Sequence, residues 1–238
     1  MTVTRQHRDE KVRRRSIPVW LETILLLVLA LVVSAIIKTF FVQMFFVPSG
    51  SMEPLLEGGP TVKNDRILVE KWSYWTQPVH RGDVVVFKDP GGRWLGAEGV
   101  QDLTPLQQAL ATIGLFPTGG HLVKRVIGVG GDEVRCCDAQ GRITVNGVPL
   151  HENSYIIGGA KPSEERFDVH VPAGRLWVMG DNRSNSEDSR FHQSLPGGGT
   201  VPVDDVVGKV WAIVWPFDRA KFLHDPATFD NPQLAPSH

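Results

Sequence analysis

The sequence of this 238-residue chain predicts a mainly β protein, with an antiparallel β-sheet or barrel-like outer domain after one N-terminal transmembrane helix. The first observation is a series of short segments that are rich in β-branched and aromatic residues and often alternate apolar with polar residues, as half-buried strands do. These segments are 66–72, 83–88, 121–128, 167–171, 175–180 and 206–215. The second observation is Asn146-Gly147 between the apolar arms of 143–150, which predicts a β-hairpin with a two-residue turn.

The third observation is the apolar stretch 17–37, which carries Glu22 as its single charge. As a helix, 21 residues would be roughly 30 Å long, which matches the hydrocarbon core of a bilayer. The preceding segment 5–15 holds six basic and two acidic residues, whereas Lys38 is the single charge that follows directly. Excess basic charge on one flank favours the cytoplasm for that end. The sequence therefore predicts a single-pass cell-membrane protein with residues 1–16 in the cytoplasm, 17–37 in the bilayer and everything after Lys38 on the outer face.

A cleaved signal peptide is the alternative interpretation of this stretch, because Val33 and Ala35 could be the small residues before a cut. The stretch is long for that purpose, and it continues past Ala35 into more apolar sequence.

Composition restricts the partners and cofactors. A net charge of −1 gives no global field that would attract nucleic acid. The two cysteines, Cys136 and Cys137, are adjacent, so a metal site built on spaced cysteine pairs is excluded. They are either two unrelated thiols or a vicinal disulfide, the latter if this region lies in an oxidising compartment. We expect no metal and no cofactor.

The outer part is expected to be a catalytic β-rich domain over 38–217. Within it, glycine pairs bound an insertion over 91–120, which could hold an amphipathic helix from Pro105 to Ile113. A small accessory β-hairpin region is expected over 133–174. The polar, proline-bearing segment 218–238 is predicted to be a flexible tail.

The segment "VPSGSMEP" (47–54) places two serines where an apolar stretch ends. None of the eight histidines lies in a glycine-rich turn that suggests catalysis, although a triad could still assemble in space. Lys124 lies in an apolar strand beside Arg125. Both could point outward or pair with carboxylates. If Lys124 is instead buried, its pKa could fall by the roughly 2–3 units that a general base near neutral pH requires, whereas arginine stays charged.

A dense polar loop, "MGDNRSNSEDSR" (179–190), directly follows an apolar strand. It could be a solvated turn with weak local ion pairs. Because its base is anchored in the core, it is also a suitable support for a functional site.

Four blocks resemble the bacterial type I signal peptidases, in this order behind an N-terminal apolar segment: "PSGSMEP", "GDVVVF", "KRVIGVGGD" and "GDNRSNSEDSR". These are membrane-bound serine–lysine endopeptidases that remove signal peptides from exported preproteins. The resemblance implies cleavage after small residues at −1 and −3, with signal peptides and the lipid bilayer as partners. It also implies a functional link to the protein export machinery.

The resemblance also implies roles for individual residues. Ser51 matches the nucleophile and Lys124 the general base. Ser49, with the backbone N–H of Ser51, matches the oxyanion hole, and Ser186 matches the serine that orients the lysine. The matches to a supporting ion network are Arg125, Asp181, Asp188 and Arg190. The matches to the walls of the substrate pockets are Phe45, Val47, Met52, Leu56, Ile67, Leu122 and Val123.

Ser184 stands where an aspartate is common in the family, which would weaken that part of the ion network. The alternatives are another membrane-anchored serine–lysine processing protease and an inactive homologue that binds peptides. Self-cleaving repressor proteases place their serine and lysine closer together than Ser51 and Lys124. A penicillin-binding SxxK motif fails because Pro54 stands three residues after Ser51.

Overall fold

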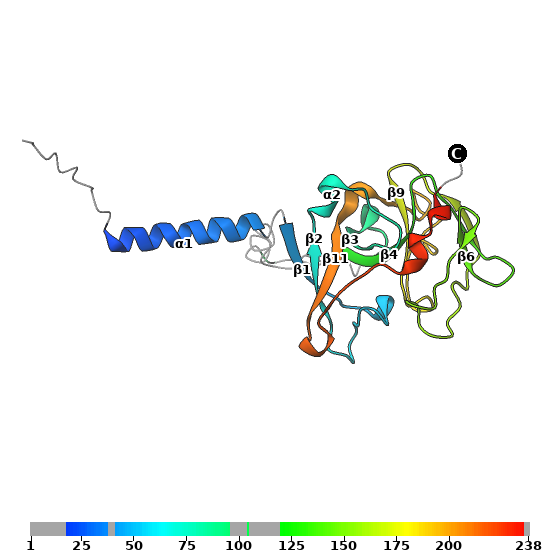
Figure 1. The fold of residues 1–238 in the computed structure, drawn as a ribbon, viewed down its shortest axis with the longest axis horizontal. Helices are drawn as coiled ribbons and strands as arrows, with labels where there is room; N and C mark the ends of the chain where they lie inside the picture. The colour runs from blue at the N-terminus through cyan, green and yellow to red at the C-terminus, as the bar shows by residue number, and fades with distance from the viewer. Residues whose placement is uncertain (1–17, 38–40, 96–103, 105–119, 236–238) are drawn as a thin grey trace, which may run out of the picture.

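A computed structural model describes residues 18–37, 41–95, 104 and 120–235, and shows two antiparallel β-sheets (Figure 1). The larger sheet has the order β1-β2-β11-β3-β4-β9-β10, with β12 paired to β11. Its strands are β1 (Val42–Phe46), β2 (Arg66–Glu70), β3 (Val84–Lys88), β4 (His121–Val129), β9 (Arg175–Met179), β10 (Val201–Pro202), β11 (Val206–Trp215) and β12 (Lys221–Phe222). The smaller sheet, β7-β6-β5-β8, consists of β5 (Glu133–Cys136), β6 (Ile143–Val145), β7 (Val148–Pro149) and β8 (Phe167–His170). The predicted mainly β class is confirmed.

The alternating segments became strands because one face or both faces of each are buried. The predicted hairpin is the turn between β6 and β7, where Asn146 and Gly147 have φ values of 52° and 79°. Positive φ at both positions is what a type I′ turn requires, and asparagine and glycine tolerate it best.

The centre of the larger sheet positions the site. Strand β4 lies between β3 and β9, with Lys124 opposite Val85 and Arg125 opposite Met179. Successive β4 side chains point to opposite faces, so Leu122 joins one buried apolar cluster and Val123 packs against another. Lys124 and Arg125 are therefore both buried, in different surroundings.

Helix α1 (Val19–Ile36) lies within the predicted span 17–37, and Figure 1 shows it in blue, extending away from the sheets. It has 18 residues, against 21 in the predicted span. In the part of the chain that the structure describes, no helix has the length and apolar character needed to cross a bilayer. The predicted transmembrane helix is therefore not confirmed. Residues 1–16 lie outside the described residues.

The remaining described helices are short. They are α2 (Ser73–Thr76), η2 (Gly50–Met52), η3 (Pro90–Gly92), η5 (Val203–Asp205), η6 (Phe217–Arg219), η7 (Ala227–Asp230) and η8 (Pro232–Leu234). Most of the predicted insertion 91–120, including the helix expected over 105–113, lies outside the described residues.

The C-terminal segment differs from the expected flexible tail. Its residues 218–235 include β12 and two 3₁₀ helices, and Leu234 is buried in the core beside the small sheet. Arg219 pairs with Asp65, and Asp225 pairs with Lys209. A polar composition therefore gave the wrong expectation, because long-range ion pairs and one buried leucine hold the segment in place.

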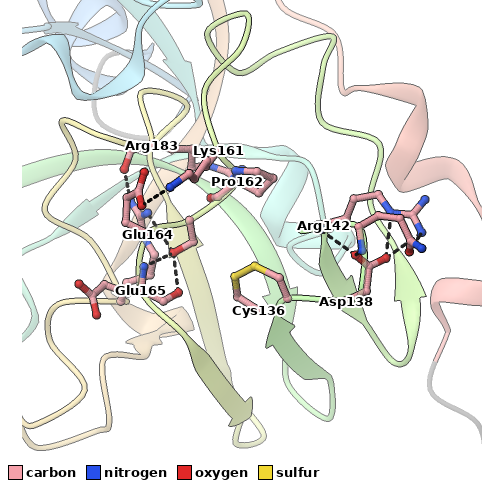
Figure 2. Close-up of a disulfide and its surroundings, with 12 residues drawn as sticks. Cys136, Asp138, Arg142, Lys161, Pro162, Glu164, Glu165 and Arg183 are labelled. Carbon is pink, nitrogen blue, oxygen red and sulfur yellow. Dashed lines mark hydrogen bonds and ion pairs between the residues drawn. A yellow bond between two sulfur atoms is a disulfide. The ribbon is translucent and has the colours of Figure 1, made fainter.

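Cys136 and Cys137 form a disulfide at the end of β5. Figure 2 shows it between the Asp138–Arg142 ion pair and the segment that carries Lys161 to Glu165. Of the two open interpretations, the structure thus has the vicinal disulfide.

We expect reduction of this disulfide to shift the thermal midpoint by no more than about 4 °C. A disulfide stabilises mainly by restricting the unfolded chain, and a bridge between neighbours closes almost no loop. Thermal unfolding followed by circular dichroism, with and without a phosphine reductant, measures the shift. The Cys136→Ser/Cys137→Ser variant, unaffected by reductant, is the control. A drop of more than about 10 °C for the wild-type chain would contradict this account.

Candidate active site

Ser51 lies in η2, the short 3₁₀ helix that follows β1. Two contacts hold this helix against the loop after β9: the N–H of Asn182 donates to the Ser51 carbonyl at 3.1 Å, and its side-chain amide donates to the Gly50 carbonyl at 3.0 Å. Because β9 is paired to β4, these contacts place Ser51 beside Lys124.

The Lys124 amine lies 2.8 Å from the Ser51 hydroxyl, as a donor to it. Both residues are buried, with 4% and 8% of their surface exposed. Burial lowers the pKa of Lys124 from 10.5 to about 8; the Asp188 carboxylate opposes this shift and Arg190 adds to it. Water cannot stabilise the ammonium form in such a site, so a substantial fraction of the amine is neutral near pH 8.

Ser49 lies two residues before Ser51, and its hydroxyl donates to the Ser51 Oγ at 3.3 Å. Ser49 is exposed, whereas Ser51 is buried. Hydrogen bonds thus connect the three predicted groups, because the Ser51 hydroxyl oxygen accepts from both Ser49 and Lys124.

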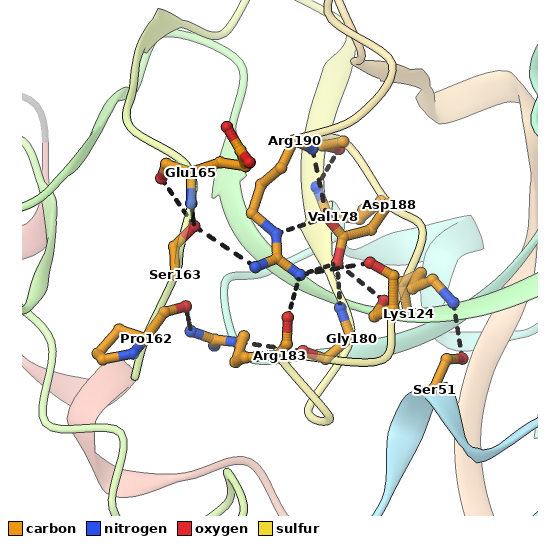
Figure 3. A network of polar contacts seen from close by, with 12 residues as sticks. Ser51, Lys124, Pro162, Ser163, Glu165, Val178, Gly180, Arg183, Asp188 and Arg190 are labelled. Carbon is orange, nitrogen blue, oxygen red and sulfur yellow. Dashed lines mark hydrogen bonds and ion pairs between the residues drawn. The ribbon is translucent and has the colours of Figure 1, made fainter. Parts of the chain in front are cut away.

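Asp188 is the centre of a buried polar network next to Lys124 (Figure 3). Its carboxylate accepts two hydrogen bonds from the Arg190 guanidinium, both at 2.8 Å, and one from the Arg190 backbone N–H at 3.2 Å. It also accepts from the N–H of Gly180 at 3.0 Å and from the hydroxyl of Ser186 at 2.8 Å. Five hydrogen bonds on one buried carboxylate fix the loop after β9 firmly.

Arg125 and Asp181 form a second buried pair. Their two hydrogen bonds are 2.8 and 2.7 Å long, and Arg125 also donates to the Gly82 carbonyl at 2.7 Å. The register explains this pair, because Met179 lies opposite Arg125 and Asp181 follows two residues later. All four residues of the predicted ion network are therefore paired, as two separate pairs.

Comparison with known proteins assigns the chain to a family. The sequence model of the family described as "Signal peptidase, peptidase S26" matches residues 20–215. The chain belongs to this signal peptidase family. Signal peptidase I from Mycobacterium tuberculosis (strain ATCC 25618 / H37Rv) is 42% identical over 217 residues, which cover 83% of this chain and 73% of the relative.

More distant relatives also align over most of the chain. Signal peptidase I from Leptolyngbya laminosa is 35% identical, covering 84% of this chain and 82% of its own. Signal peptidase I U from Bacillus subtilis (strain 168) is 29% identical, covering 84% and 91%. A crystal structure of a signal peptidase I from Enterococcus faecalis V583 has 22% identity and a TM-score of 0.36, and covers 56% of this chain and 97% of that one.

Ser186 does not make the hydrogen bond predicted for it in this S26 peptidase. Its single hydroxyl proton goes to Asp188, and the described contacts include no bond between Ser186 and Lys124. The oxygen of Ser186 keeps lone pairs that could accept from an ammonium. A direct role in orienting Lys124 stays a prediction.

The predicted pocket residues divide into groups. Val47, Met52, Leu56 and Ile67 belong to one core cluster, and each is at most 2% exposed. Phe45 and Val123 pack against this cluster and are partly exposed, whereas Leu122 belongs to a different cluster. Four of the predicted wall residues are thus enclosed in the core, whereas Phe45 and Val123 are partly accessible, and the role of all seven in substrate binding stays a prediction.

A third buried pair in this S26 peptidase could not be predicted from the sequence. Arg183 donates to Glu152 at 2.6 and 3.1 Å and to the Pro162 carbonyl at 2.8 Å. Tyr155 donates to Glu152 at 2.6 Å, and Arg125 lies over its ring. Glu152 stands in an ordinary polar loop, and no local pattern marks it as buried.

The described residues offer no alternative site for a metal. Among them, no group of three or more histidine, cysteine, aspartate or glutamate side chains is arranged to hold an ion.

Proposed function

We propose that this S26 peptidase is a serine endopeptidase that cleaves N-terminal signal peptides from exported preproteins, using Ser51 and Lys124. The contact between the Lys124 amine and the Ser51 hydroxyl, 2.8 Å apart in a buried site, carries the proposal. A nucleophile within hydrogen-bond reach of a base with lowered pKa is the arrangement that covalent catalysis requires.

In the proposed reaction, the Ser51 Oγ attacks the carbonyl carbon of the residue at −1. The lone pair of neutral Lys124 takes the hydroxyl proton as the new C–O bond forms. The same proton then passes to the leaving nitrogen, the C–N bond breaks, and an acyl-enzyme remains. A water molecule, deprotonated by Lys124, hydrolyses this ester and restores Ser51.

The oxyanion of the tetrahedral intermediate would be held by the hydroxyl of Ser49 and the backbone N–H of Ser51. The hydroxyl of Ser49 now donates to Ser51, so it must rotate toward the oxyanion as the serine attacks. Loss of one such donor typically costs on the order of 10²–10³ in rate.

We propose that the substrate binds as an extended strand beside β1 and β4. Within the described strands, β1 is at the end of its sheet, paired only with β2, so its other edge can add a strand. Backbone hydrogen bonds would then supply affinity. The partly exposed side chains of Phe45 and Val123 would restrict the residues at −1 and −3 to small ones.

Cleavage of a model preprotein by the full chain in detergent tests the function, with N-terminal sequencing of the product. We expect one cut after a small residue, and no cut by Ser51→Ala. A wild-type chain that binds the signal peptide without cutting it would instead support an inactive peptide-binding homologue.

We also propose that the N-terminal segment attaches the peptidase to a lipid bilayer. The exposed side chains of α1 are mostly leucine and valine, which lose contact with water at a lipid surface. Flotation with lipid vesicles should carry the full chain and leave a chain without residues 1–37 at the bottom. Equal flotation of both would contradict the proposal. The orientation of the N-terminus toward the cytoplasm stays a prediction.

The rate of cleavage should rise with pH through about 8. Lys124 acts only as the neutral amine, and a pKa of about 8 makes about a tenth of it neutral at pH 7 and about nine-tenths at pH 9. Steady-state kcat measured from pH 6 to 10 checks this.

His192 provides the control for this pH profile. His192 is buried just after the loop that follows β9. Its ring packs against the ring of Trp94, and burial lowers its pKa from 6.5. His192→Gln should leave the midpoint near 8. A midpoint below 6.5 that disappears in this variant would contradict the assignment of the base to Lys124.

A further inference from the structure

We propose that Asn182 is a positioning residue that aims the backbone N–H of Ser51 at the oxyanion. The inference rests on the proposed function and extends it to a residue for which the sequence suggested no role. Asn182 is buried, and it follows β9 by three residues.

Asn182 holds the peptide groups on both sides of the nucleophile. Its side-chain amide donates to the Gly50 carbonyl at 3.0 Å, and its backbone N–H donates to the Ser51 carbonyl at 3.1 Å. One residue thus contacts the carbonyl before Ser51 and the carbonyl of Ser51 itself. Among the described residues, no other side chain donates to either carbonyl.

The first of these contacts controls the direction of an oxyanion donor. The Gly50 carbonyl and the Ser51 N–H belong to the same planar peptide group, and in a trans peptide they point in opposite directions. The Gly50–Ser51 bond is not among the cis bonds of the chain. A donor that fixes the carbonyl on one side therefore fixes the N–H on the other side.

The neighbours of Asn182 determine which way its amide faces. The Gly50 carbonyl and the Glu53 carboxylate, 3.0 and 3.5 Å from the amide nitrogen, can only accept hydrogen bonds. On the opposite side, the hydroxyl of Ser184 donates to the amide oxygen at 3.4 Å. The amide nitrogen must therefore face η2, as the proposed role requires.

The expected effect is smaller than the loss of an oxyanion donor. The Gly50 carbonyl also accepts from the N–H of Glu53 at 3.2 Å, so it keeps one partner without Asn182. We expect Asn182→Asp and Asn182→Ala to lower kcat by about 10- to 30-fold, below the 10²–10³ of a lost donor.

Asn182→Asp is the sharper variant, because it keeps the shape and the backbone N–H but cannot donate from its ionised side chain. Asn185→Asp is the matched control, since Asn185 is exposed in the same loop and undergoes the same chemical change. Each variant is assayed for kcat and KM on the model preprotein and for kcat on a small activated acyl ester. Binding is measured for a peptide aldehyde and for the product signal peptide.

The peptide aldehyde distinguishes positioning from a merely structural role. The Ser51 oxygen adds to its carbonyl carbon and the hydroxyl proton moves to the new hemiacetal oxygen, which occupies the oxyanion position. We expect the Asn182 variants to bind the aldehyde about 10- to 30-fold more weakly, in step with kcat. KM and the affinity for the product peptide should stay within about twofold of wild type in both Asn182 variants. The pH midpoint should stay within about 0.3 pH units of wild type in Asn182→Ala, which adds no charge near Lys124. Asn185→Asp should match wild type.

Unchanged kcat in both Asn182 variants would overturn the inference. So would an equal loss of affinity for aldehyde and product peptide together with a lower thermal midpoint, which would indicate a structural role. A wild-type chain that hydrolyses the ester but not the preprotein would contradict the proposed substrate, and the ester assay would still decide the role of Asn182. A wild-type chain inactive in both assays and unable to bind the aldehyde would overturn both proposals.

Discussion

Lys124→Met is expected to lower kcat for preprotein cleavage by at least about 10³-fold and to leave the fold intact. Methionine fills nearly the same volume as lysine, but it has no lone pair basic enough to take the Ser51 proton. Removing an amine that is only 4% exposed and has a lowered pKa leaves no unpaired charge behind, so the thermal midpoint should stay equal or rise. Single-turnover cleavage and thermal unfolding measure the two effects.

Two further variants make this prediction specific. Lys124→Arg should be equally inactive, because arginine keeps its charge in any protein environment. Lys88→Met removes an exposed lysine from the neighbouring strand and should cleave like wild type. The dyad would be refuted if Lys124→Met stayed active while His192→Gln lost activity.

Gly180→Ala should lower kcat by about 10²-fold or more, because it adds a methyl group where there is no room. A Cβ at this position would overlap the Ser186 hydroxyl and the Ser51 carbonyl oxygen. The N–H of Gly180 also donates to Asp188, so the backbone cannot move away without breaking that bond. The methyl group must therefore displace the nucleophile, the Asp188 network, or both.

Gly158→Ala is the matched control, since a Cβ there would meet no atom within 4 Å and its φ lies outside the left-handed region. It should retain wild-type kcat and stability. Near-normal cleavage by Gly180→Ala would show that the reaction tolerates displacement of Ser51 or of the Asp188 network.

Local patterns in the sequence were enough to predict most of the described strands and one turn. Alternating residues mark β8 because one face of that strand meets the core and the other does not, whereas β3 is an apolar run whose first four residues are buried on both faces. Asn146-Gly147 marks its hairpin because both residues tolerate positive φ. The same kind of reasoning failed for 218–235, because nothing local shows that Leu234 enters the core or that Arg219 finds Asp65.

The candidate active site likewise has contacts that the sequence motifs predicted and contacts that they did not. The four motif blocks were enough to select Ser51 and Lys124 and to place Arg125, Asp181, Asp188 and Arg190 in an ion network. The sequence could not show that Ser186 donates to Asp188, or that Arg183 is paired with Glu152, 31 positions away. Such pairs depend on which loops the sheets bring together.

Residue types at short spacing were enough to predict the family, most of the strand-forming segments, and Ser51 and Lys124 as the two residues proposed to react. The tertiary structure brings the Lys124 amine, 73 positions away in sequence, to 2.8 Å from the Ser51 hydroxyl. It also places the side-chain amide of Asn182, 132 positions from Gly50, where it donates to the Gly50 carbonyl just before Ser51. The physical reason is that a pKa and a hydrogen-bond direction depend on burial and on neighbours distant in sequence, which only the folded sheet brings together.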